Sequence, residues 1–221
     1  MDAHYLEYIT KFSQFCIGIP LLVGLFFFRR LNRSQRLLFL LVLASCIVET
    51  IASMMTAYKF SNNLYVYNSY TIINLNIVFL IYLALFKPRT KTILTGFLIL
   101  ANGFALLNAI FLQPFNTFNS NTLVLVSVIL LIMALSYFYR LMTDVKFHKL
   151  ERDPLFWLSA GIIMYYSSAT VLFIYSNHVI AYDPNDPNSE LLFLASWGLN
   201  SIFNLILVTA YTITLWVKAL K

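Results

Sequence analysis

The chain has 221 residues, of which 60% are hydrophobic and only 11% are charged, and its net charge is +6. Soluble domains carry about 25% charged residues, so this composition excludes an ordinary soluble domain and indicates a membrane protein. The positive charge does not predict nucleic-acid binding, because Lys and Arg gather in the cytoplasmic loops of membrane proteins. We therefore expect an all-α protein with one bundle of membrane-spanning helices and the lipid bilayer as its surroundings.

Seven stretches are long and apolar enough to cross a bilayer, which requires about 20 mostly apolar residues. The first contains Pro20, at which we expect a kink, because neighbouring helices can satisfy the backbone groups that a proline frees. The first residues are mildly acidic and the first positive cluster follows the first apolar stretch, an order that does not fit a cleavable signal peptide. The seven predicted helices are Leu6–Phe28, Leu37–Tyr58, Leu64–Phe86, Thr92–Leu112, Thr122–Met142, Leu155–Ser176 and Glu190–Val217.

Lys and Arg are distributed unevenly over the linkers between these helices. Of the 15 basic residues, all except Lys11 and Lys59 fall beside alternate linkers or at the C-terminus. The positive-inside rule then predicts that the N-terminus lies outside and the C-terminus inside. The regular alternation also supports seven helices, since a missed helix would disturb it.

One carboxylate, Glu49, lies deep inside an apolar stretch. A charge at the bilayer centre costs at least ~2.5–3.5 kcal/mol, so such a residue is a candidate for a functional site. Helical spacing places Ser45 and Ser53 on the same face, and a small, polar stripe of this kind faces protein rather than lipid. No Lys, Arg or His occurs at this depth in any predicted helix. We therefore expect a neutral Glu49 that is hydrogen-bonded to an Asn or Tyr, unless a cationic ligand or ion supplies the opposite charge.

Other predicted helices also carry polar residues near the depth of Glu49, since each residue of a helix rises about 1.5 Å. Two interpretations remain open. These side chains either join helices through hydrogen bonds, which average ~0.6 kcal/mol each, or line a ligand-binding pocket. The predicted polar core consists of Glu49, Ser45, Ser53, Asn74, Asn76, Asn102, Tyr165, Ser168, Asn200 and Asn204.

The sequence contains no pattern that predicts a metal site, a cofactor or a catalytic nucleophile. Cys16 and Cys46 lie in apolar stretches without paired Cys or His spacing. The acidic stretch Asp183–Glu190 lacks the glycine and glutamate positions of an EF-hand loop. No His lies in a predicted span beside a Ser or Cys, so nucleophilic catalysis is not supported. With a single carboxylate deep inside the predicted spans, the sequence favours a non-enzymatic protein without cofactors.

The chain from the third predicted helix onward contains a set of short sequence motifs: Asn108–Pro114 (NAIFLQP), Tyr137–Leu141 (YFYRL), Asp153–Trp157 (DPLFW), Tyr165–Ser167 and Ser176–Asn177. With them, the chain resembles a group of uncharacterised short seven-helix integral membrane proteins of Bacteroidetes-type bacteria. The resemblance implies the seven-helix topology, a bacterial inner (plasma) membrane and a role in signalling. It carries over no catalytic residues.

The leading functional hypothesis is a sensory or small-ligand-binding membrane subunit that acts through a cytoplasmic or membrane signalling partner. The alternative is a small transporter or channel with a mid-membrane polar site around Glu49, which would need broken helices around a water-accessible path. A membrane-embedded lipid enzyme would need a second acidic or His group in the same pocket. The predicted helices offer only one carboxylate away from their ends, so this third possibility ranks last.

Overall fold

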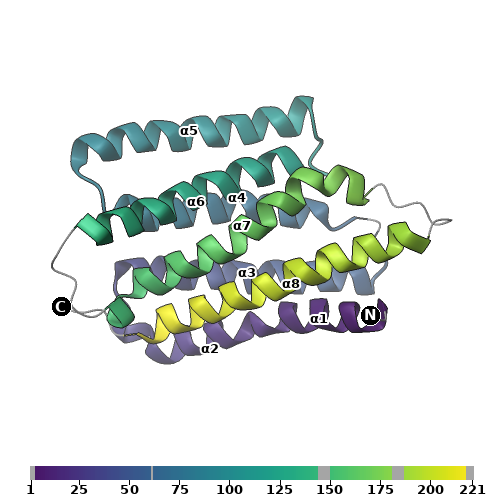
Figure 1. Ribbon diagram of the computed structural model, residues 1–221, viewed down its shortest axis with the longest axis horizontal. Helices are drawn as coiled ribbons and strands as arrows, with labels where there is room; N and C mark the ends of the chain where they lie inside the picture. Colours follow the sequence, from purple (N-terminus) through teal and green to yellow (C-terminus); the bar gives the residue numbers. More distant parts are fainter. Residues whose placement is uncertain (1–2, 61, 144–149, 181–186, 218–221) are drawn as a thin grey trace.

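The computed structural model describes residues 3–60, 62–143, 150–180 and 187–217, and every regular element in these ranges is a helix. Seven spans are long and apolar enough to cross a membrane, which confirms the predicted number. In Figure 1 the spans run side by side along the long axis of the molecule. The main helices are α1 (Ala3–Cys16), α2 (Gly18–Phe27), α3 (Arg33–Ala57), α4 (Leu64–Leu83), α5 (Pro88–Phe111), α6 (Ser120–Thr143), α7 (Pro154–Ile180) and α8 (Pro187–Trp216).

The first span is broken, and Pro20 explains the position of the break. Helix α1 ends at Cys16 and α2 begins at Gly18, with Ile17 between them. Proline has no N–H to bond to the carbonyl four residues earlier, here that of Cys16, and its ring clashes with that carbonyl. The predicted kink is therefore present as an interruption one turn before the proline.

Several helices begin earlier than predicted because their first turns are polar but well capped. Helix α3 starts at Arg33 rather than Leu37. The Asn32 side chain accepts a hydrogen bond from the Gln35 backbone N–H (2.8 Å), and the Gln35 side chain accepts one from the Asn32 backbone N–H (3.0 Å), which forms a capping box. Helix α5 starts with Pro88, a residue favoured in the first helical turn.

Helix α8 has a central place in the bundle, where it packs against α1, α2, α3 and α7. Helix α7 also packs against α6, while α5 lies at the edge of the bundle against α4 and α6 (Figure 1). Gly161 allows the close approach of α7 to α8, since a Cβ at that position would lie 2.3 Å from the Ala210 Cβ. Small residues at helix contacts permit such short distances in membrane proteins.

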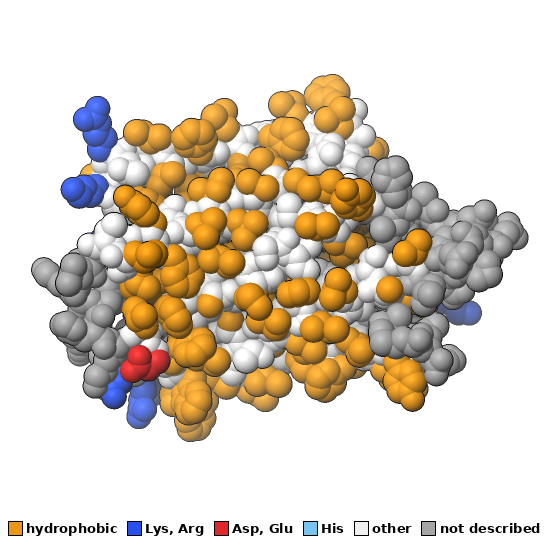
Figure 2. All heavy atoms as spheres, in the orientation of Figure 1, with side chains coloured by type: hydrophobic (Ala, Val, Ile, Leu, Met, Phe, Trp, Pro, Cys, Tyr) orange, Lys and Arg blue, Asp and Glu red, His pale blue; other side chains and the backbone are white. Residues whose placement is uncertain are grey.

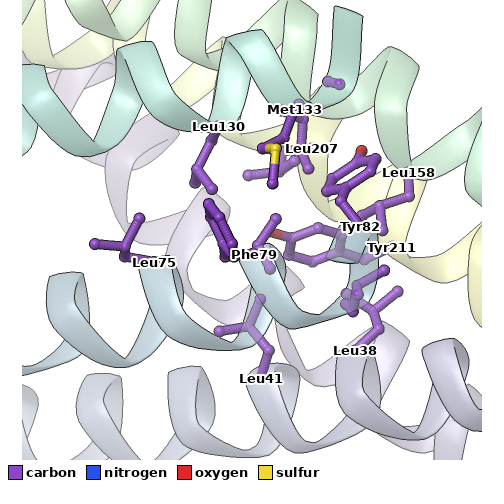
Figure 3. Close-up of a cluster of buried hydrophobic side chains, with 14 of the residues drawn as sticks. Leu38, Leu41, Leu75, Phe79, Tyr82, Leu130, Met133, Leu158, Leu207 and Tyr211 are labelled. Carbon is purple, nitrogen blue, oxygen red and sulfur yellow. The ribbon is translucent and has the colours of Figure 1, made fainter. Parts of the chain in front are cut away.

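The hydrophobic core fills the half of the bundle that contains the start of α3 and the ends of α4 and α8. Within it, the hydroxyls of Tyr82 and Ser159 form a buried hydrogen bond of 2.7 Å. Figure 3 shows its central side chains, which come from five helices: Leu38, Leu41, Leu75, Phe79, Tyr82, Leu130, Met133, Leu158, Leu207 and Tyr211.

The outer surface between the two ends of the bundle is apolar. Phe15, Phe26 and Met142 are each more than four-fifths exposed. Figure 2 shows hydrophobic side chains over the middle of the visible face, with Lys and Arg at its two ends. Soluble monomers rarely expose continuous apolar surface of this extent. The surface and the seven spans together indicate a multi-pass membrane protein.

Candidate functional site

A cavity of about 540 Å³ lies among α1, α3, α4, α6, α7 and α8. It occupies the half of the bundle opposite the start of α3, next to the hydrophobic core, and Leu207 and Tyr211 belong to both. The volume falls within the ~300–1,000 Å³ typical of small-molecule pockets. Six of the ten predicted polar-core residues line it: Ser45, Glu49, Asn74, Tyr165, Asn200 and Asn204.

Glu49 lies on the wall formed by α3 and α4. Its side chain is half-buried, and its Oε2 accepts a hydrogen bond of 3.1 Å from the Tyr67 hydroxyl. The predicted hydrogen bond to a tyrosine or asparagine is thus present. One turn away, the Ser45 hydroxyl donates to the Leu41 carbonyl (3.0 Å) and lies 2.6 Å from the Tyr70 hydroxyl. Ser45 and Glu49, four residues apart on α3, therefore face Tyr70 and Tyr67, three residues apart on α4.

Asn74 connects α4 with α7 at the same cavity. It is only 6% exposed, and its Nδ2 donates a hydrogen bond to the Tyr166 hydroxyl. The neighbouring Tyr165 ring lies edge-on to the Tyr166 ring, with 4.8 Å between centroids. Asn200 on α8 is a neighbour of Tyr165. Polar side chains of α4, α7 and α8 therefore lie close together along one side of the cavity, the polar seam.

Helices α1 and α8 form the remaining polar wall. Asn204 Nδ2 donates a hydrogen bond of 2.9 Å to the Ser13 hydroxyl, which donates one of 3.1 Å to the Ser201 carbonyl. The Ser201 hydroxyl donates to the Trp197 carbonyl on its own helix (2.9 Å). These bonds fix α1 against α8 and hold the face of α8 that carries Trp197 and Asn200 toward the cavity.

Three buried side-chain atoms lack a hydrogen-bond partner among the described residues: Asn74 Oδ1, Asn200 Oδ1 and Trp197 Nε1. All three residues line the cavity. An unsatisfied buried polar group costs about 1–3 kcal/mol, and native structures contain few of them. The cavity is thus lined by three residues whose amide or indole groups have an atom without a partner among the described residues.

Three aromatic side chains, Phe118, Phe173 and Trp197, form an aromatic wall over the part of the cavity nearest the α5–α6 loop. The Phe118 ring packs edge-on to the Trp197 ring at 5.9 Å and lies 6.2 Å from the Phe173 ring. Asn68 positions this loop, since its Nδ2 donates to the carbonyls of Phe115 (2.8 Å) and Thr117 (2.9 Å). The cavity thus has a polar seam at one side and an aromatic wall at the other.

Two predicted polar-core serines lie outside the cavity. Ser53 is exposed, because each i+4 step turns about 40° around a helix and two steps from Ser45 leave the buried face of α3. Ser168 is half-buried and does not line the cavity. The buried face of α7 includes Tyr166 and Phe173, and Ser168 lies two residues past Tyr166, on the far side of the helix. The prediction that these serines face the site was wrong.

Asn76 and Asn102 also lie away from the cavity, at the contact between α4 and α5. Each amide donates to the other, at 2.9 and 3.2 Å, and each also donates to the carbonyl four residues earlier. Every part of this pair has a partner within the bundle. Of the two interpretations, a link between helices therefore fits these two residues, which do not line the cavity.

Sequence reasoning identified Tyr165 but missed Tyr67 and Tyr70, two other tyrosines of the site. Tyr67, Tyr70 and Asn74 follow one another at spacings of three and four along α4 and all line the cavity. Tyr166 and Ser13 were missed as well, although each bonds directly to a predicted residue. The available signal was the i, i+3, i+7 pattern of hydroxyl and amide groups on α4, which apolarity alone does not reveal.

The chain matches no protein-family model, no curated protein and no solved structure. Among the described residues there is no group of three or more His, Cys, Asp or Glu side chains that could hold a metal ion. Residues 183–186 of the acidic stretch lie outside the described residues. The geometry of the cavity is therefore the feature that bears on function.

Proposed function

We propose that this protein is a non-enzymatic sensory subunit that binds a small ligand in the cavity around Glu49. The observation that carries the proposal is a cavity of about 540 Å³ whose lining combines Glu49 with the amides of Asn74 and Asn200 and the indole of Trp197. A void left by imperfect packing would be lined by apolar side chains and stay empty. A few polar groups on a mostly apolar wall are instead typical of a small-molecule pocket.

A ligand in this position would connect helices that otherwise touch only in part. The cavity lies between the α3–α4 pair and the α7–α8 pair, so an occupant would contact both. Binding shifts a protein toward the conformation that makes better contacts with the ligand. The described linkers are short, so we propose that this shift is passed to a partner protein in the membrane or the cytoplasm.

The proposed location is a bacterial inner membrane, with the N-terminus outside and the C-terminus inside. The uneven distribution of Lys and Arg supports this orientation. The cavity would then belong to the outer half of the bundle, because its lining includes Asn63 and Phe118 near the ends of the predicted outer loops. A ligand would reach it from the outer side or from the outer leaflet.

Occupancy of the cavity can be tested with three probes of one shape: 4-phenylbutylamine, 4-phenylbutanol and 4-phenylbutanoate. The protein is studied in nanodiscs as the Trp157→Phe/Trp216→Phe variant, which leaves Trp197 in the cavity wall as the only indole. We expect saturable quenching or a shift of the Trp197 emission by at least one probe. No saturable change with any of the three would contradict the proposed function.

A blocked cavity provides the control for this experiment. Thr71→Phe places a ring in the cavity and removes only a hydrogen bond to the Tyr67 carbonyl on the same helix. Ile73→Phe adds a ring of the same size on the exposed face of α4. Binding should be lost with Thr71→Phe and retained with Ile73→Phe. Equal binding by both variants would place the probe outside the cavity.

A transporter is the second candidate, favoured by the break in the first span. Ile17, the residue between α1 and α2, lines the cavity. Discontinuous helices beside a polar site are a feature of many transporters. Proteoliposomes distinguish the two functions: a sensor binds the probe without moving it, whereas a transporter carries it into the lumen faster than empty liposomes do.

A further inference from the structure

We propose that the ligand of this cavity is an organic ammonium ion, with a protonated amine seated at Glu49 and an apolar body against the aromatic wall. This inference rests on the proposed function and specifies the chemical class of its ligand. It follows from four properties of the cavity: its charge, its hydrogen-bonding groups, its aromatic lining and its size.

The charge of the described lining is negative, and no described lining residue carries an opposite charge. Glu49 is its only carboxylate, and it contains no Lys, Arg or His. A carboxylate at membrane depth is costly and is normally paired. The Tyr67 hydroxyl supplies one hydrogen bond but no charge. A cationic ligand would supply the opposite charge at this position.

The unpartnered hydrogen-bonding groups favour the same ligand. Asn74 Oδ1 and Asn200 Oδ1 are buried acceptors without donors. An ammonium group has several N–H donors and no acceptor, so it suits a site of acceptors. A carboxylate or phosphate ligand would meet those acceptors with more acceptors and would be repelled by Glu49. The Trp197 indole N–H is the remaining unpartnered donor, and a hydroxyl or carbonyl on the ligand body would accept its hydrogen bond.

The surroundings of Glu49 are rich in π systems that attract cations. Tyr67 bonds to its carboxylate, and Tyr70 and Tyr165 lie near enough to interact with its charge. Nine aromatic side chains line the cavity in all. Cations bind over aromatic faces within about 6 Å, and ammonium ligands are recognised in aromatic cages of this kind.

The size and composition of the cavity exclude a bare inorganic ion as its main occupant. A volume of about 540 Å³ accommodates a whole organic molecule. The hard cations Ca²⁺ and Mg²⁺ require six or more oxygen ligands in a compact shell. The described lining offers a single carboxylate beside apolar and aromatic surface instead. An ammonium with an apolar body fits both parts of this lining.

The three 4-phenylbutyl probes test the inference, because they share a shape and differ in charge. In nanodiscs of phosphatidylcholine, 4-phenylbutylammonium should bind to the single-indole protein about tenfold more tightly than 4-phenylbutanol, and 4-phenylbutanoate should bind most weakly. Glu49→Gln should remove the preference for the amine and leave the affinity for the alcohol within about twofold. Glu151→Gln, the same change in an exposed carboxylate at the end of the bundle, should leave the preference intact.

The outcomes separate this inference from the proposed function. If the alcohol binds as tightly as the amine and both are excluded by Thr71→Phe, the inference fails and the small-ligand site stands. Retention of the preference in Glu49→Gln would also overturn it. If none of the probes binds, both proposals fail.

The same experiment identifies the source of the ammonium group. Adding phosphatidylethanolamine to the nanodiscs supplies a primary amine on a lipid headgroup. Competition with the probe in the wild type, but not in Glu49→Gln, would assign the site to an aminolipid. Undiminished probe binding in these nanodiscs would assign it to a soluble amine.

Discussion

The close contact between α7 and α8 gives the sharpest prediction about the bundle that holds the site. In Gly161→Ala, the added Cβ would lie 2.3 Å from the Ala210 Cβ and 3.5 Å from Leu207 Cδ1. Carbon atoms in contact lie about 3.5–4.0 Å apart, so the two helices would have to separate by more than 1 Å. Both methyl groups are attached directly to the backbone, and neither can turn away. Overpacking of this kind costs about 1–3 kcal/mol.

Gly103→Ala is the matched control for this experiment. No atom lies within 4 Å of a Cβ at Gly103, which is exposed on α5. Alanine favours a helix over glycine by about 1 kcal/mol at either position, so the difference between the two variants isolates the clash. We expect Gly161→Ala to unfold at a lower concentration of the denaturing detergent sodium dodecyl sulfate, with a free energy of unfolding about 1–3 kcal/mol below that of Gly103→Ala. Far-UV circular dichroism during the detergent titration measures the unfolding of both variants.

Moving the methyl group across the interface provides the second control. The double variant Gly161→Ala/Ala210→Gly keeps one Cβ between the helices and should recover most of the lost stability, with a coupling energy above about 0.5 kcal/mol. Because this contact holds Tyr165 and Tyr166 beside Asn200, Gly161→Ala should also weaken probe binding. A Gly161→Ala protein that is as stable as Gly103→Ala would refute the close approach of α7 and α8.

Three further predictions concern the polar residues and the topology. A double-mutant cycle with Asn76→Leu and Asn102→Leu should give a coupling energy of about 1 kcal/mol, with no effect on probe binding, because the pair lies outside the cavity. Ser45→Ala removes the hydrogen bond to Tyr70 and should lower the free energy of unfolding by about 0.5–1.5 kcal/mol, whereas Ser53→Ala, at an exposed position, should change it by less than about 0.5 kcal/mol. Equal effects would contradict the placement of Ser45 on the buried face of α3 and of Ser53 outside it. A green fluorescent protein fused to the C-terminus should fluoresce and alkaline phosphatase fused there should be inactive, and the reverse pattern would invert the proposed orientation.

The fold followed from the sequence as far as hydrophobicity determines it. Seven apolar stretches gave seven spans because the membrane requirement depends on local length and composition. The helix ends were less accurate, since a search for apolar residues discards polar first turns. Arg33 and Pro88 belong to helices because of capping by Asn32 and the preference of proline for the first turn, and both signals were present in the sequence.

The candidate site followed from the sequence less completely, and α4 shows why. Asn74 and Asn76 lie two residues apart, so they point to different sides of one helix. Hydrophobicity places both residues at membrane depth, but it does not show which side of the helix contacts α5 and which side lines the cavity. That distinction depends on where α5, α7 and α8 pack. Asn76 finds Asn102, whereas Asn74 finds Tyr166 and retains a free acceptor.

The distribution of satisfied and unsatisfied amides argues against a purely structural role for the polar residues. Asn108 lies in the same membrane-spanning bundle and is 1% exposed, yet it donates to Asn119 and Thr122 and accepts from Asn121. If polar residues served only to join helices, atoms without partners would occur at helix contacts as well. All three such atoms among the described residues belong instead to side chains that line the cavity. A buried polar group without a partner costs about 1–3 kcal/mol, so apolar residues at these positions would suit a purely structural bundle better. Polar side chains at the cavity are better explained by an occupant that bonds to them.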